Sequence, residues 1–143
     1  MLPMNYLYSD LTEKIIGAAI SVHKQLGPGY PEKIYQRALA EEFKKQNIAF
    51  NREEKFRVFY GDKDVGYEII DFCVYDRIAI ELKAMREIMD LHAKQLVSYL
   101  KERRLRLGLI LNFGKSKLEI KELFYEGRPA VTEDTEGSTE TQR

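Results

Sequence analysis

The sequence predicts a mixed α/β (α+β) domain in which helices flank a β-sheet, with the element order α-α-β-β-β-α-β-β. Three segments repeat apolar residues every three to four positions, as on one face of an amphipathic helix. Five other segments either alternate apolar and polar residues or are apolar throughout, as strands do. Three successive strands, then a helix and a further strand, favour a mixed sheet with helices packed on it.

The expected helices span residues 10–26, 31–46 and 90–103. Asp10-Leu11-Thr12-Glu13 has the pattern of a capping box at the start of the first helix. Gly27-Pro28-Gly29 is expected to end that helix. Pro31 suits the first turn of the second helix, because a missing N–H costs nothing there.

The expected strands span residues 56–60, 65–74, 77–83, 105–113 and 117–125. Gly61-Asp62 is a hairpin signal between the first two strands, and Tyr75-Asp76 is a short turn between the second and third. Leu105–Phe113 is apolar on both faces, which predicts a buried strand.

Length and composition predict one soluble domain at residues 1–125 and a disordered acidic tail at residues 126–143. Formal net charge is zero, but removing the tail leaves 21 bases and 18 acids, a net charge of +3. The sequence shows no signal peptide and no apolar run long enough to cross a membrane, so we expect a cytoplasmic protein without a membrane partner. A single cysteine excludes an intrachain disulfide and a cysteine-built metal site.

The candidate chemistry lies on the second and third strands. Asp71 stands inside an apolar strand, where an unpaired carboxylate is costly and needs a partner or a metal. Glu81 and Lys83 are two positions apart on the next strand and therefore share one face. Because a short turn makes the strands antiparallel neighbours, Asp71 and Glu81 can converge. Two carboxylates form a hard oxygen site for Mg²⁺ or Mn²⁺, and a neighbouring lysine suits phosphodiester hydrolysis.

A structural explanation of the same residues stays open at this point. Acid, then acid-x-lysine, arises often by chance, and a Glu81–Lys83 ion pair can cap the edge of a sheet. The apolar surroundings of the three charges favour the metal site, because such charges are seldom buried without a purpose.

The chain also resembles a known family. Asp71 followed by Glu81-Leu82-Lys83 is similar to the PD-(D/E)xK nuclease core, with Ile70 at the proline position. Gly29-Tyr30-Pro31-Glu32-Lys33-Ile34-Tyr35 reads GxxExxY, the motif that names one branch of that superfamily. The resemblance runs from about residue 10 to 125 and includes Leu109-Ile110-Leu111-Asn112-Phe113. It implies a restriction-endonuclease-like core and Mg²⁺- or Mn²⁺-dependent cleavage of nucleic acid, DNA rather than RNA.

The resemblance implies further site residues. Glu32 matches a glutamate that reaches the metal, although a glutamate in a first helical turn is also favoured by the helix dipole. Gln95 and Tyr99 match a QxxxY element that supports the site and contacts nucleic acid. Without the family, Tyr99 would be assigned to the core and Gln95 to the surface. Glu68 departs from the family, where a basic residue is expected, and either weakens phosphate binding or adds a metal ligand.

Partners and alternatives complete these expectations. A basic cluster at Lys101, Arg103, Arg104 and Arg106 suits phosphates, but it also suits the end of a helix, where the dipole favours cations. The alternative to a nuclease is a non-catalytic nucleic-acid-binding or scaffold protein with the same fold. A homodimer and an unidentified protein partner are further expectations.

Overall fold

The computed structural model describes residues 8–127, and within them it has the predicted element order. The helices are α1 (Ser9–Leu26), α2 (Glu32–Lys45) and α3 (Asp90–Arg103), and the strands are β1 (Phe50–Tyr60), β2 (Lys63–Val74), β3 (Ile78–Lys83), β4 (Leu107–Asn112) and β5 (Glu119–Phe124). The sheet order is β1-β2-β3-β4-β5. Strands β3 and β4 are parallel, and the other neighbouring pairs are antiparallel. The prediction of a mixed sheet flanked by helices is confirmed.

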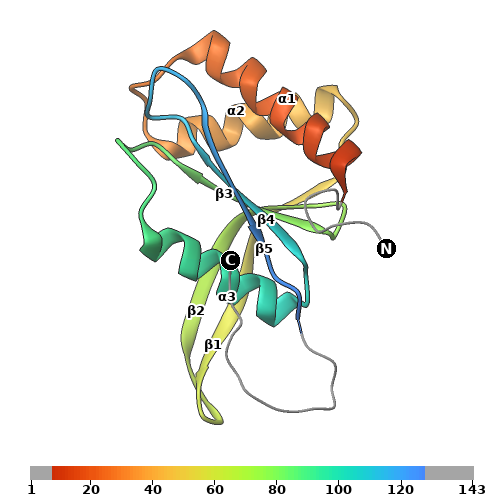
Figure 1. The fold of residues 1–143 in the computed structure, drawn as a ribbon, viewed down its shortest axis with the longest axis vertical. Helices are drawn as coiled ribbons and strands as arrows, with labels where there is room; N and C mark the ends of the chain where they lie inside the picture. Colours follow the sequence, from red (N-terminus) through yellow and green to blue (C-terminus); the bar gives the residue numbers. More distant parts are fainter. Residues whose placement is uncertain (1–7, 128–143) are drawn as a thin grey trace.

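Helices cover both faces of the sheet (Figure 1). On one face, Tyr35 and Phe43 of α2 pack with residues of α1 against Phe72, Ile80 and Leu109 of the sheet. On the other face, Leu96, Tyr99 and Leu100 of α3 pack against Ala79 and Ile110. The alternation of side chains along β3 therefore divides its residues between two cores, with Ile78, Ile80 and Leu82 under α1 and α2.

The β1–β2 hairpin extends beyond the rest of the sheet (Figure 1). β2 pairs with β3 at its last three residues, Phe72–Val74, whereas β1 pairs with β2 along nearly its whole length. We call residues 54–70 the β1–β2 arm. Its base is a fork at Asp71, where β2 and β3 diverge, and Phe56 and Ile70 anchor its inner face on α3.

Two boundary predictions were wrong. β1 begins at Phe50 rather than at residue 56, because residues 51–55 are largely charged and lie on an edge strand, where no apolar alternation is required. The predicted capping box is also absent from the start of α1. The N-cap is Tyr8 in a left-handed conformation without a side-chain hydrogen bond, and Asp10 lies inside the first turn.

Two further predictions concern membrane-spanning helices and the C-terminal tail. No helix within residues 8–127 combines the length and the apolar character that crossing a membrane requires. The predicted disordered tail at residues 126–143 lies, except for its first two residues, outside the described part of the chain.

Candidate active site

Asp71 lies at the fork between β2 and β3. The antiparallel register of Phe72 with Ile80 would place Asp71 opposite Glu81 if the ladder continued. Instead, the Asp71 carboxylate itself takes part in the hydrogen bonding, because its Oδ2 atom accepts a hydrogen bond from the backbone N–H of Leu82 at 2.8 Å. The side chain therefore closes the fork and is fixed in position by β3.

Gln36 of α2 holds the second oxygen of Asp71. The Gln36 side chain is buried, and its Nε2 atom donates a hydrogen bond to Asp71 Oδ1 at 2.7 Å. Sequence reasoning missed this residue. The available signal was a polar residue next to Tyr35, on the inward side of an otherwise apolar helix face. With one donor on each oxygen, Asp71 is oriented and keeps free lone pairs.

Glu81 and Lys83 share a half-buried face of β3, as their spacing predicts. The Lys83 Nζ atom lies 3.5 Å from Glu81 Oε2, and each side chain is 15% exposed. The Glu81 Oε1 atom is buried and has no hydrogen-bond partner among residues 8–127. Burial and then repulsion from the Asp71 carboxylate raise the pKa of Glu81 to about 8, against the opposing effect of Lys83.

The donor chemistry of this pair fits a divalent cation. An unpaired buried carboxylate oxygen costs free energy, and two carboxylates that repel each other need a positive charge. Hard oxygen donors of this kind suit Mg²⁺ or Mn²⁺. No group of three or more His, Cys, Asp or Glu side chains within residues 8–127 forms a complete metal site. The structure thus brings Asp71, Glu81 and Lys83 together. Glu32 is exposed and does not complete a three-residue metal-binding group with Asp71 and Glu81.

The GxxExxY segment shapes the start of α2. Gly29 has φ of 117°, a conformation that side chains seldom adopt. The Tyr35 hydroxyl donates a hydrogen bond to the Gly27 carbonyl at 2.5 Å and accepts one from the backbone N–H of Tyr30 at 3.2 Å. The fully buried Tyr35 ring also stacks on Phe113 with 4.7 Å between centroids. The motif tyrosine therefore fixes the turn that leads into α2.

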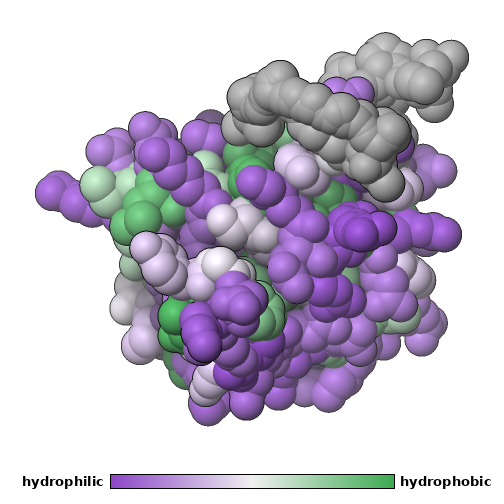
Figure 2. Space-filling view, turned by 90° about the horizontal axis from the view of Figure 1, so that it is seen from below, coloured by the Kyte–Doolittle hydropathy of each residue, from purple (hydrophilic) through white to green (hydrophobic). Residues whose placement is uncertain are grey.

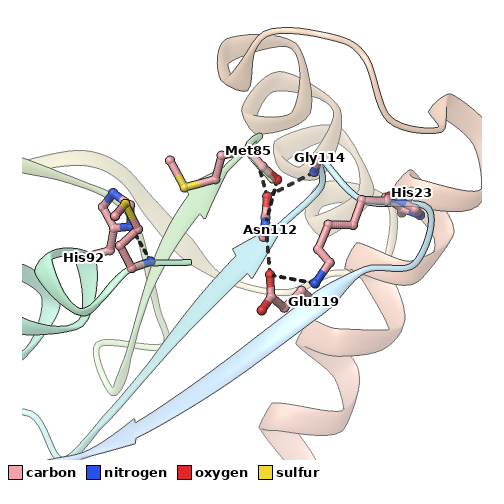
Figure 3. Close-up of polar contacts among 8 residues, drawn as sticks. His23, Met85, His92, Asn112, Gly114 and Glu119 are labelled. Atoms are coloured by element: carbon pink, nitrogen blue, oxygen red, sulfur yellow. Dashed lines mark hydrogen bonds and ion pairs between the residues drawn. The ribbon is translucent and has the colours of Figure 1, made fainter. Parts of the chain in front are cut away.

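His92 connects the start of α3 electrostatically with the other site residues. Its Nδ1 atom accepts a hydrogen bond from the backbone N–H of Met89 at 3.1 Å (Figure 3). Burial and then Lys83 lower the pKa of His92, whereas Glu32 raises it. Glu32 and Lys83 therefore both lie within electrostatic reach of one imidazole.

Asn112 is a second residue that sequence reasoning missed as a site component. It lies beside Lys83 in the parallel β3–β4 register and is fully buried. Its amide accepts from the N–H of Met85 and donates to the carbonyl of the same residue, each at 3.0 Å (Figure 3). It also accepts from Gly114 N–H at 3.1 Å and donates to Glu119 at 3.0 Å. Asn112 thus fixes the chain two residues after Lys83.

Three of the α3 residues that are expected to contact nucleic acid also bind side chains of the arm. Gln95 Nε2 donates a hydrogen bond to Glu68 Oε1 at 2.6 Å, which gives the family-atypical Glu68 a partner on α3. Tyr99 is fully buried, and its hydroxyl donates to Glu54 at 2.5 Å. Arg103 is half-buried and forms an ion pair with Glu54.

The rest of the basic cluster is on the surface. Lys101, Arg104 and Arg106 are exposed, and Arg104 ends α3 in a left-handed conformation. His23 and Cys73 are buried, and His23 is hydrogen-bonded to the Lys115 carbonyl at 2.8 Å.

Comparisons with known proteins agree with this architecture. A model of the PD-(D/E)XK nuclease superfamily matches residues 9–123. Searches of curated proteins and of solved structures gave no significant match. The match spans every helix and all strands but the last residue of β5, and it contains the fork with Asp71, Glu81 and Lys83. The chain therefore belongs to the PD-(D/E)XK nuclease superfamily.

Proposed function

We propose that this protein hydrolyses phosphodiester bonds of nucleic acid, DNA rather than RNA, with Mg²⁺ or Mn²⁺ at Asp71 and Glu81. The observation that carries the proposal is the buried, unpartnered Glu81 oxygen beside a second carboxylate, with the Lys83 ammonium 3.5 Å from Glu81. The finer assignment to the GxxExxY branch is part of the proposal and rests on residues 29–35.

Each residue has a chemical role in the proposed reaction. Asp71 and Glu81 hold the cation, Glu32 is the further carboxylate, and the backbone carbonyl of Leu82 is a further oxygen. The bound cation supplies Lewis-acid stabilisation of the negative charge that develops on the phosphate. Lys83 donates hydrogen bonds that orient the attacking water and neutralise charge on the phosphate oxygens. Gln36 and the Leu82 N–H keep Asp71 oriented throughout.

The residues of α3 fall into two groups in this proposal. The exposed Lys101 and Arg104 are predicted phosphate contacts, as is the half-buried Gln95 once Glu68 releases it. Tyr99 and Arg103 act through Glu54, because their polar atoms already bind it, and they hold the arm against α3.

Cleavage assays on a broad panel of DNA and RNA test the catalytic proposal. With Mn²⁺ present, the wild-type protein should cleave and Lys83→Ala should not, because the charge beside Glu81 is lost. Lys24→Ala, which removes an exposed lysine of α1, is the matched control and should cleave normally. Failure of both the wild type and Lys83→Ala on every substrate would show that catalysis is the wrong interpretation.

The second candidate is a non-catalytic nucleic-acid-binding or scaffold protein. The formal net charge of zero favours it, because nucleic-acid-binding proteins are commonly basic. Calorimetric titration with Mn²⁺ separates the candidates, since a scaffold has no need of the cation. Clear Mn²⁺ binding that is lost in Asp71→Ala would exclude the scaffold version. The homodimer, the protein partner and the cytoplasmic location stay predictions.

A further inference from the structure

The β1–β2 arm exposes a concentration of large apolar side chains. Six of them are between 39% and 81% exposed: Val58, Phe59, Tyr60, Val65, Tyr67 and Ile69. The arm projects at the lower end of the molecule in Figure 1. Figure 2 looks at that end from below and shows apolar side chains in patches between hydrophilic ones. Apolar side chains gathered on one projecting hairpin indicate a contact surface.

The strand register separates an inner from an outer face of the arm. Glu54, Phe56 and Ile70 are on the inner face, in contact with α3. Lys55 pairs with Ile69, and Arg57 pairs with Tyr67, so these four side chains lie on the outer face. We call Lys55, Arg57, Phe59, Tyr67 and Ile69 the outer-face cluster; Phe59 belongs to it because its cross-strand partner, Asp64, forms an ion pair with Arg57.

Cations and an aromatic ring are interleaved in the outer-face cluster. Lys55 Nζ lies 4.7 Å from the centroid of the Tyr67 ring, and the Arg57 guanidinium carbon lies 5.4 Å from it. Tyr67 is 47% exposed. Aromatic rings that accept stacked bases, with cations placed to meet phosphates, are the usual composition of a surface for single-stranded nucleic acid.

The arm is held in place and leads to the fork. Glu54 binds Tyr99 and Arg103, and Glu68 binds Gln95, so α3 supports the inner face at two places. β2 then runs directly from the outer-face cluster to Asp71. A strand that lies along the arm is therefore directed toward the candidate active site.

We propose that the outer-face cluster binds single-stranded nucleic acid flanking the bond at the fork. Bases stack on Tyr67 and Phe59, and Lys55 and Arg57 contact phosphates. The link to cleavage rests on the proposed function, but binding at the arm is measurable without it.

A second copy of the chain fits this face less well than nucleic acid does. A two-fold interface places a patch against itself, so the cations of one copy would be buried near those of the other, and Asp64 on this face pairs with Arg57 and leaves the charge of Lys55 uncompensated within residues 8–127. Like charges that are desolvated together oppose association. Phosphates instead provide the opposite charge, and base faces match the aromatic rings.

Fluorescence anisotropy with labelled single-stranded DNA of about 20 nucleotides, longer than a typical single binding site, tests the aromatic contact in the absence of divalent cations. Tyr67→Leu should bind about 5-fold or more weakly than the wild type, because loss of a stacked base has an effect of that order. Tyr67→Phe keeps the ring and should bind as the wild type does. Equal affinities of Tyr67→Leu and Tyr67→Phe would overturn the proposal.

The salt dependence of the same binding tests the phosphate contact. Lys55→Ala should reduce the slope of log affinity against log salt by about 0.7, the value for one phosphate of a single strand. Lys14→Ala, an exposed lysine of α1, should leave the slope unchanged. An unchanged slope in Lys55→Ala would contradict the assignment. A wild-type dimer that Tyr67→Leu converts to a monomer in light scattering would show a protein interface instead.

The arm proposal and the proposed reaction can be refuted independently of each other. If Asp71→Asn loses cleavage but still binds DNA in a way that depends on Tyr67 and Lys55, the arm proposal is supported. The reaction is then judged by the cleavage assays alone. If the wild type cleaves nucleic acid but Tyr67→Leu and Lys55→Ala do not change its DNA binding, the arm proposal is wrong and the proposed reaction still stands. Absence of any binding by the wild-type protein would overturn the arm proposal.

Discussion

The surroundings of Glu81 make its ionised form unfavourable unless a cation is bound. Its Oε1 atom is buried without a partner in residues 8–127, and Asp71 repels its charge. Holding the proton is therefore favourable in the cation-free protein. A cation reverses this preference, because it binds the ionised form and compensates both carboxylates.

The stability of the cation-free protein should fall as pH rises toward 8. Folded Glu81 has a pKa of about 8, whereas the ordinary value is 4.5, so between these values the folded state binds more protons than the unfolded state. The stabilisation is complete below pH 4.5 and is lost as pH rises through 8, with a slope of at most about 1.4 kcal/mol per pH unit. Thermal melts in a chelating buffer measure it.

Glu81→Gln is the control for that pH dependence. It has no carboxyl proton to lose, so its melting temperature should decline less between pH 5 and pH 8 than that of the wild type. Added Mn²⁺ should raise the wild-type melting temperature more at pH 8 than at pH 5. Identical pH profiles of the wild type and Glu81→Gln would show that Glu81 is not the titrating group.

At the scale of elements, α3 is tied to β1 through one acid. Glu54 accepts hydrogen bonds from Tyr99 and Arg103, and the Tyr99 ring packs edge-on against Phe56 with 5.0 Å between centroids. Burial and the hydrogen bond to Glu54 raise the pKa of the Tyr99 hydroxyl, so it stays a donor. This tie fixes the arm relative to the helix that carries Gln95.

Tyr99→Phe distinguishes the two interpretations of that tyrosine. The variant keeps the ring and loses the bond to Glu54, so the free energy of unfolding in urea should fall by about 1–3 kcal/mol. Oligonucleotide affinity should not change. Glu54→Gln should be non-additive with it, as expected for residues in contact. Weaker DNA binding at unchanged stability would instead support a direct contact of Tyr99 with nucleic acid.

A second element-scale tie connects β3 and β4 beyond Lys83. Asn112 binds both backbone groups of Met85, and the Lys83 carbonyl accepts a hydrogen bond from Phe113 N–H at 2.8 Å. A Cβ atom on Gly114 would lie 2.3 Å from the Met85 nitrogen, so glycine is required where the segment after β4 approaches the segment after β3. The segment after β3 is thus held by the Asn112 side chain and by a close backbone approach that requires glycine at position 114.

At the scale of the whole molecule, charge is distributed unevenly along the chain. The 143 residues have no net charge, whereas residues 1–125 have +3. Phosphates attract the body of the protein and are repelled by the acids that follow it. The net charge of zero therefore understates the attraction that the domain itself can exert.

A chain that ends at Tyr125 should bind single-stranded DNA more tightly than the full chain at low salt. The difference should shrink as salt rises, because exposed charges are screened over about 10 Å at 0.1 M. A full-length variant with the five tail acids changed to their amides controls for length; with 23 bases and 18 acids its net charge is +5, so it should bind at least as tightly as the truncated chain. A difference that is equal at low and high salt would exclude the electrostatic explanation.

The sequence by itself determined the order of elements and the shared strand face of two candidate site residues. Apolar periodicity identified every helix and strand to within a few residues, except the charged edge of β1, because burial imposes the pattern only where one face is covered. The spacing of Glu81 and Lys83 determined their common face, since strand geometry fixes it locally.

Tertiary structure alone decided which residues support the fork. Gln36 is 35 positions from Asp71, and Asn112 is 27 positions from Met85, so no local pattern links them. It also decided that Tyr99 and Arg103 of α3 share Glu54 of β1 as their partner. Local periodicity specifies a face, but the partner of a polar side chain depends on how separate elements pack, and that is fixed only when the sheet and its helices assemble.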